Sequence, residues 1–82
     1  MTYKIIPTKE FIKDSKKVDS LTLKKIKKKI EEVAENPKRY KHLRGPLSIF
    51  CRIRIGKLRI LFSYDKERRE IYPEKIIFGH KY

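Results

Sequence analysis

The sequence predicts an α+β domain in which an N-terminal strand and a helical hairpin pack on one face of a small antiparallel sheet. Apolar residues recur at helical spacing in the first half of the chain and alternate with polar residues in the second half. The predicted elements follow the order strand, helix, helix and three strands, which favours helices gathered on one side of a sheet. With 82 residues, the chain is expected to form one domain, residues 1–82.

The N-terminal segment predicts a short strand and a short helix. Residues 3–6 have the composition of a strand, which Pro7 ends. Thr8 stands where its side chain would cap a helix that begins at Lys9 or Glu10.

A longer helix is expected next, because Asp19 and Ser20 form a second cap signal and Asn36-Pro37 is a stop signal. Apolar residues repeat between these signals at helical spacing: Leu23, Ile26, Ile30 and Val33. The opposite side of the helix carries five lysines: Lys24, Lys25, Lys27, Lys28 and Lys29. We consider Lys24 and Lys28 candidate RNA-binding residues, but the same lysines could equally form a solvated face balanced by nearby glutamates.

The second half of the chain predicts three strands. Residues 49–55 alternate, Gly56-Lys57 fits a two-residue type II′ turn with glycine first, and residues 58–64 form the return strand. A turn at residues 65–69 leads into a last strand over roughly residues 70–79.

The alternation predicts a basic surface on the side of the sheet that faces away from the helices. If Cys51 and Ile53 pack against the helices, Arg52 and Arg54 point the other way, and Arg59 joins them from the return strand. Residues 49–64 contain no Asp or Glu that could pair with these arginines locally. We therefore expect the three arginines to bind phosphate.

The composition of the chain limits which classes of binding partner and cofactor are expected. The formal net charge of +13 indicates polyanionic partners, either nucleic acid or an acidic protein. We expect a cytoplasmic protein with no membrane partner, because there is no signal peptide and no apolar run long enough to cross a bilayer. Cys51, the only cysteine, cannot form an intramolecular disulfide and is expected to be a buried thiol. Neither a metal nor a cofactor is expected, since the two histidines and the cysteine lack any ligand spacing.

Cleavage of RNA suits these residues, because the 2′-hydroxyl of the substrate supplies the nucleophile. The protein must then move protons and stabilise charge on the phosphoryl oxygens, and arginine does the latter well. His80 is a candidate for proton transfer, and Tyr82 for base stacking or proton transfer, while structural roles remain open for both. The basic loop at residues 38–48 and the predicted hairpin turn supply further candidate RNA-binding residues: Lys41, Arg44 and Lys57.

The chain resembles the RelE toxins of the RelE/ParE superfamily, the toxin halves of prokaryotic toxin–antitoxin pairs. The resemblance covers nearly the whole length and rests on five motifs in order: Asn36-Pro37, Lys41-x-Leu43-x-Gly45, Arg52-Ile53-Arg54-Ile55-Gly56, Leu58-Arg59-Ile60 and Gly79-His80-Lys81. It implies a microbial-ribonuclease-like fold and a metal-free enzyme that enters the ribosomal A site and cleaves the mRNA codon there. It also implies an acidic, RelB-like antitoxin as partner.

The resemblance implies roles for individual residues. Arg59 matches the arginine that contacts the scissile phosphate, while Arg52 and Arg54 match basic residues that hold mRNA and assist proton movement. Lys81 stands where the family usually has arginine, and it lacks the planar fork of that side chain. Tyr82 follows at once, whereas the functional tyrosine of the family lies several residues further on. Tyr82 replaces that tyrosine, or the role is vacant.

Two other functions stay open. The ParE toxins of the same superfamily bind and poison DNA gyrase without cutting RNA. A toxin that occupies the ribosome or binds RNA without cleaving it is the third interpretation. Arg52, Arg54 and Arg59 favour the endonuclease, and the missing downstream tyrosine keeps the gyrase interpretation open.

Overall fold

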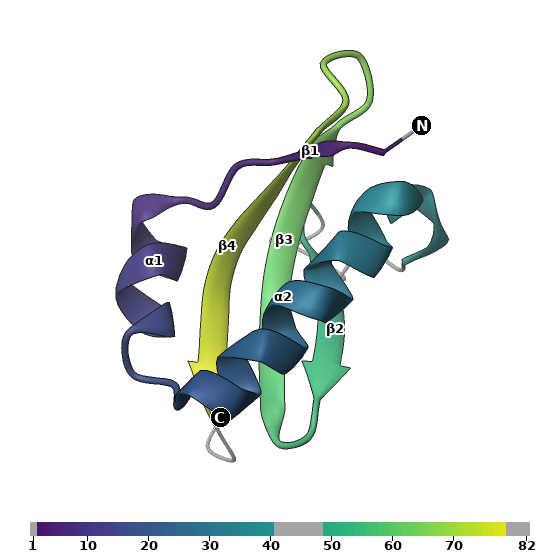
Figure 1. Ribbon diagram of the computed structural model, residues 1–82. Coiled ribbons are helices and arrows are strands. Elements are labelled where there is room, and N and C mark those ends of the chain that lie inside the picture. Colours follow the sequence, from purple (N-terminus) through teal and green to yellow (C-terminus); the bar gives the residue numbers. More distant parts are fainter. Residues whose placement is uncertain (1, 41–48, 79–82) are drawn as a thin grey trace.

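Two helices cover one face of a four-stranded sheet (Figure 1). The computed structural model describes residues 2–40 and 49–78. In chain order, its elements are β1 (Lys4–Ile5), α1 (Lys9–Ser15), α2 (Ser20–Glu35), the 3-10 helix η1 (Pro37–Arg39), β2 (Cys51–Ile55), β3 (Leu58–Asp65) and β4 (Glu70–Phe78). The sheet order is β1-β4-β3-β2. The predicted α+β class is thus confirmed, with the refinement that β1 lies parallel to β4 and makes the sheet mixed.

Both helices begin at the predicted caps. The Thr8 hydroxyl accepts a hydrogen bond from the Phe11 backbone N–H at 3.2 Å. The Asp19 carboxylate accepts one from the Thr22 N–H, also at 3.2 Å. Hydrogen bonding from the Thr22 side chain, and next from this N–H, lowers the pKa of Asp19. These bonds use N–H groups that have no partner within the helix, and so they define where α1 and α2 start.

The hairpin of β2 and β3 has the predicted register. Arg54 pairs with Arg59 and Ile55 with Leu58 across the turn. Gly56 has a φ of 58°, and among the described residues Arg69 is the only non-glycine with a positive φ. In a type II′ turn only the first of the two turn residues has a positive φ, whereas both do in type I′. Gly56-Lys57 therefore forms a type II′ turn, and its first position favours glycine.

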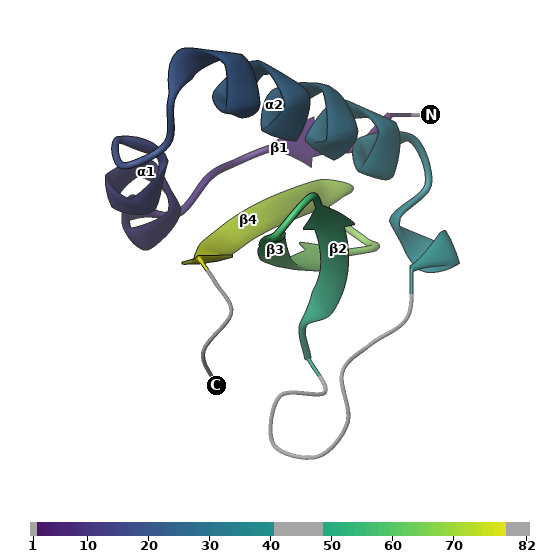
Figure 2. The same cartoon turned by 90° about the horizontal axis from the view of Figure 1, so that it is seen from below.

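The core lies between α2 and the sheet. The inward face of α2 buries Ile26, Ile30, Val33 and Ala34. The inward face of the sheet buries Cys51, Ile53, Ile60, Phe62, Ile71 and Ile76. Figure 2 shows the helices together on one side of the sheet and no described helix on the other side. The helices therefore leave the second face of the sheet open for the polar side chains of the alternating strands.

Helix α1 closes the edge of β4 that β1 does not reach. β1 bonds to the first half of β4, ending with the Thr8 N–H on the Pro73 carbonyl at 3.0 Å. Beyond Pro73, the Thr8 hydroxyl donates to the Glu74 carbonyl at 3.1 Å. The Ile76 N–H then donates to the Asp14 carboxylate at 3.1 Å. The side chains of Thr8, the N-cap of α1, and of Asp14 within the helix thus replace a missing strand at this edge.

Candidate nucleic-acid interface

Three arginines form one cluster on the open face of the sheet, which we call the arginine face: Arg52, Arg54 and Arg59. Arg52 and Arg54 are exposed, while the residues between and beside them, Cys51 and Ile53, are buried under α2. Arg59 lies directly opposite Arg54 on β3 and is half-buried. The predicted gathering of the arginines on the face away from the helices is therefore correct.

The pairing of Arg54 with Arg59 places two positive charges side by side. Directly opposed side chains on antiparallel strands have Cβ atoms about 5 Å apart. Like charges at directly opposed positions of a sheet are destabilising, and an anion bound near both side chains would offset their repulsion. On its other side, Arg59 is paired with Ile77 of β4. The arginine face thus carries several positive charges close together, next to the apolar Ile77. Such a cluster of guanidinium groups suits the binding of a phosphate group.

The open face also carries a polar half that the sequence did not reveal. Ser63 of β3 donates a hydrogen bond to the Glu74 carboxylate at 2.7 Å. The Tyr72 hydroxyl donates to the Glu70 carboxylate at 2.5 Å, a bond that raises the pKa of the phenol. Ser63 is four residues from Arg59 along β3, which corresponds to about 13 Å. Acidic groups therefore lie on the same face as the arginines but toward the other end of the strands.

Leu61 separates the two halves of the open face. It lies between Arg52 on β2 and Lys75 on β4, and its side chain is 6% exposed although it faces away from the core. The register of β3 against β4 shifts immediately after it. The open face is therefore not wholly solvated, and its basic and acidic halves meet at a buried leucine.

The lysines of α2 lie on a different side of the molecule. α2 covers the face of the sheet opposite the arginine face, and Lys24 and Lys28 are exposed on it (Figure 2). Lys29 forms an ion pair with Glu32 at 3.6 Å. The molecule thus presents two separate basic surfaces, and a single short RNA strand would not lie on both.

Of the remaining predicted site residues, some lie in the described part of the chain and others lie outside it. Lys57 is exposed in the hairpin turn, at the end of the arginine face. Cys51 is buried as expected, and burial raises the pKa of its thiol. The other candidates fall in residues 41–48 and 79–82, outside the described residues: Lys41, Arg44, His80, Lys81 and Tyr82. Residues 2–40 and 49–78 hold no group of three or more potential metal ligands. Neither described helix is both long and apolar enough to span a bilayer.

Residues 5–72 match the family described as the ParE toxin of the type II toxin-antitoxin system parDE. The chain belongs to the RelE/ParE toxins. RelE4 of Methanocaldococcus jannaschii, a candidate toxin, is 43% identical over 56 residues, which cover 67% of this chain and 60% of that relative. The aligned part thus spans less than two thirds of the relative's length. The predicted family is confirmed.

Solved structures of RelE toxins have the same fold as this RelE/ParE toxin. The toxin–antitoxin complex RelBE2 of Mycobacterium tuberculosis matches with a TM-score of 0.87 and 21% identity, covering 96% of this chain and 100% of that chain. The isolated RelE toxin of E. coli matches with a TM-score of 0.81 and 19% identity, covering 98% and 87%. At these identities the likeness establishes the fold, and the chemistry has to be argued from this chain's own residues.

Proposed function

We propose that this toxin is a ribosome-dependent endonuclease that cleaves mRNA in the A site. The observation that carries the proposal is the packing of Arg52, Arg54 and Arg59 on one open face. Cleavage by the substrate's own 2′-hydroxyl requires neither a protein nucleophile nor a metal, but it does require positive groups at the phosphoryl oxygens. The toxin would act in the cytoplasm, where translating ribosomes present the mRNA.

Within this proposal, Arg59 stabilises the charge that develops on the scissile phosphate. Arg54 lies directly opposite it on β2, and Arg52 lies diagonal to it on the same strand. Arg52 and Arg54, both on the neighbouring strand β2, hold the mRNA backbone, and Lys57 extends the contact around the hairpin turn. Proton transfer is assigned to His80, Lys81 or Tyr82, and additional RNA contacts to Lys41 and Arg44. Lys24 and Lys28 lie on the other side of the molecule and would contact a different stretch of RNA.

The proposed inhibitor is an acidic, RelB-like antitoxin. The formal net charge of +13 favours a partner that carries many carboxylates. The structural neighbour from M. tuberculosis is itself a toxin–antitoxin complex. An antitoxin that covers the arginine face would exclude mRNA from the same phosphate-binding groups.

Primer extension on mRNA bound to programmed ribosomes tests the proposal. Arg59→Ala is expected to lower the cleavage rate by about 100-fold or more while the toxin still associates with ribosomes. Arg68→Ala provides the matched control, because Arg68 is an exposed arginine in the turn between β3 and β4, away from the arginine face. Cleavage at the wild-type rate by Arg59→Ala, or cleavage without ribosomes, would contradict the proposed mechanism.

Inhibition of DNA gyrase is the second candidate function. The observation in its favour is the match of residues 5–72 to the family described as ParE toxin. In this function the arginine face would bind a protein surface, and mRNA would remain intact. A supercoiling assay with purified gyrase separates the two candidates, because the endonuclease is expected to leave the supercoiling rate unchanged.

A further inference from the structure

A second candidate binding site lies at the end of the sheet, on the helix side of the hairpin turn. It is a cavity of about 370 Å³ between the start of α2, the turn of β2 and β3, and the end of β4. We call it the end groove, and its principal lining residues are Lys17, Val18, Lys25, Lys57, Leu58 and Phe78. It is distinct from the arginine face, because Leu58 and Phe78 point toward the helices.

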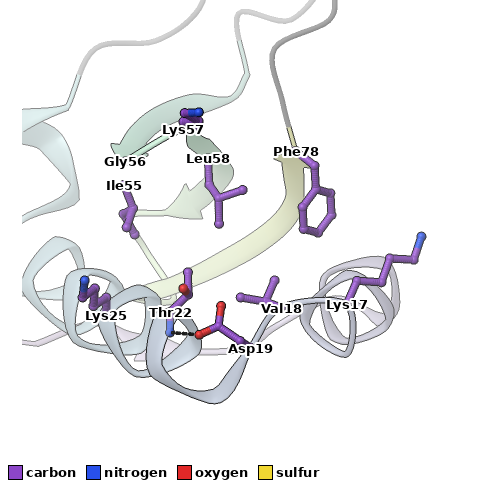
Figure 3. A pocket seen from close by; sticks show the side chains of 10 residues that line it. All are labelled: Lys17, Val18, Asp19, Thr22, Lys25, Ile55, Gly56, Lys57, Leu58 and Phe78. Carbon is purple, nitrogen blue, oxygen red and sulfur yellow. Dashed lines mark hydrogen bonds between the residues drawn. The ribbon is translucent and has the colours of Figure 1, made fainter.

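The floor of the end groove is apolar. Figure 3 shows the side chains of Leu58 and Phe78 converging from the sheet toward Val18 on the opposite wall. Phe78 keeps 41% of its surface exposed, and with Leu58 and Val18 it forms a continuous apolar lining. A bulky aliphatic or aromatic side chain placed here would remove this apolar surface from water.

The rim of the end groove is positive. Lys17, Lys25 and Lys57 come from three different segments, and Figure 3 shows them around the apolar floor. One carboxylate, that of Asp19, also lines the groove, but its Oδ2 atom already accepts the Thr22 N–H bond. A ligand that fills this groove therefore needs an apolar centre flanked by negative charge.

We infer that the end groove binds an acidic peptide segment that inserts one bulky apolar side chain between Leu58, Phe78 and Val18. The inference deepens the proposed antitoxin partnership and rests on it, with the antitoxin supplying the segment. Two of the three floor side chains, Val18 and Leu58, are aliphatic, so the floor favours an apolar peptide side chain over a nucleobase, which stacks on aromatic rings. Lys57 lies two residues from Arg59, so a bound segment could continue around the hairpin turn onto the arginine face.

Selection of random peptides displayed on phage, with the full toxin as bait, tests the inference. Enriched peptides are expected to carry a bulky apolar residue next to Asp or Glu. The double variant Lys17→Glu/Lys57→Glu is expected to weaken their binding about tenfold or more. Lys16→Glu/Lys66→Glu changes the net charge equally on exposed residues outside the groove, and it is expected to weaken binding by less than about twofold.

A second pair of variants isolates the apolar floor. Phe78→Ser is expected to lower peptide affinity about tenfold. Ile12→Ser removes a similarly exposed apolar side chain, 45% exposed on α1, and is expected to have no effect. Equal losses in the matched variants, or enriched peptides without an apolar residue, would overturn the inference.

An RNA oligonucleotide whose affinity falls selectively with Phe78→Ser would also overturn it, by reassigning the groove to nucleic acid. The measurement contains neither ribosomes nor mRNA. If the peptide-binding test fails, the proposed cleavage of mRNA is not contradicted. If cleavage is not observed, the peptide-binding test can still be read by itself.

Discussion

At the scale of single residues, the facing pair Arg54 and Arg59 is expected to lower the stability of the fold while it serves the proposed cleavage of RNA. Arg54→Glu would replace a cross-strand repulsion by an attraction, so we expect it to raise the free energy of unfolding by about 0.5–1 kcal/mol at low salt. Under the proposed function, the same variant lowers the cleavage rate, because it places a carboxylate beside the scissile phosphate. Urea denaturation at low and high salt measures the first effect, and the gain should shrink as salt screens the pair.

Arg52→Glu is the matched control for this pair. Arg52 is equally exposed but lies opposite Leu61, so the carboxylate would have no directly facing cation and a smaller gain is expected. If both variants change stability equally, the effect comes from net charge and not from the facing pair.

At the scale of elements, α1 stabilises the fold by satisfying the edge of β4. Asp14→Ala removes the acceptor of the Ile76 N–H, and Ile76 is buried at 1% exposure. We expect a loss of about 1–3 kcal/mol in the free energy of unfolding, measured by urea denaturation. Asp14→Asn keeps an oxygen acceptor and should lose less than half as much. Wild-type stability in Asp14→Ala would show that this bond contributes nothing.

At the scale of the whole molecule, the two basic surfaces should make unequal contributions to RNA binding. Each phosphate contact on a single strand contributes about −0.7 to the slope of log affinity against log salt. Replacing all three arginines of the arginine face by alanine should therefore reduce the slope by about 2. Fluorescence anisotropy with a labelled RNA oligonucleotide over a salt series measures this change.

The matched variant for the other surface is Lys24→Ala/Lys27→Ala/Lys28→Ala. It removes the same charge from exposed positions on α2. A small change in slope would identify the α2 lysines as a solvated face. A change as large as that of the arginine variant would mean that RNA contacts both surfaces, and the arginine face would lose its special role in binding.

The sequence by itself determined the features that depend on neighbours along the chain. The caps at Thr8 and Asp19, the glycine turn at Gly56 and the arginine face all follow from bonds or alternation within a few residues. Helical and strand periodicity show directly which side of an element is apolar, so the open face of the hairpin could be predicted as well.

Only the tertiary structure decided the features that join distant segments. The bond from Ile76 to Asp14 spans 62 positions, and the parallel pairing of β1 with β4 has no local signal. The polar half of the open face depends on the register of β4, which shifts beside Leu61 and brings Glu74 to Ser63. The end groove likewise exists only where three segments meet. Register and packing at such distances are set by the burial of the whole core, and alternation along one strand does not encode them.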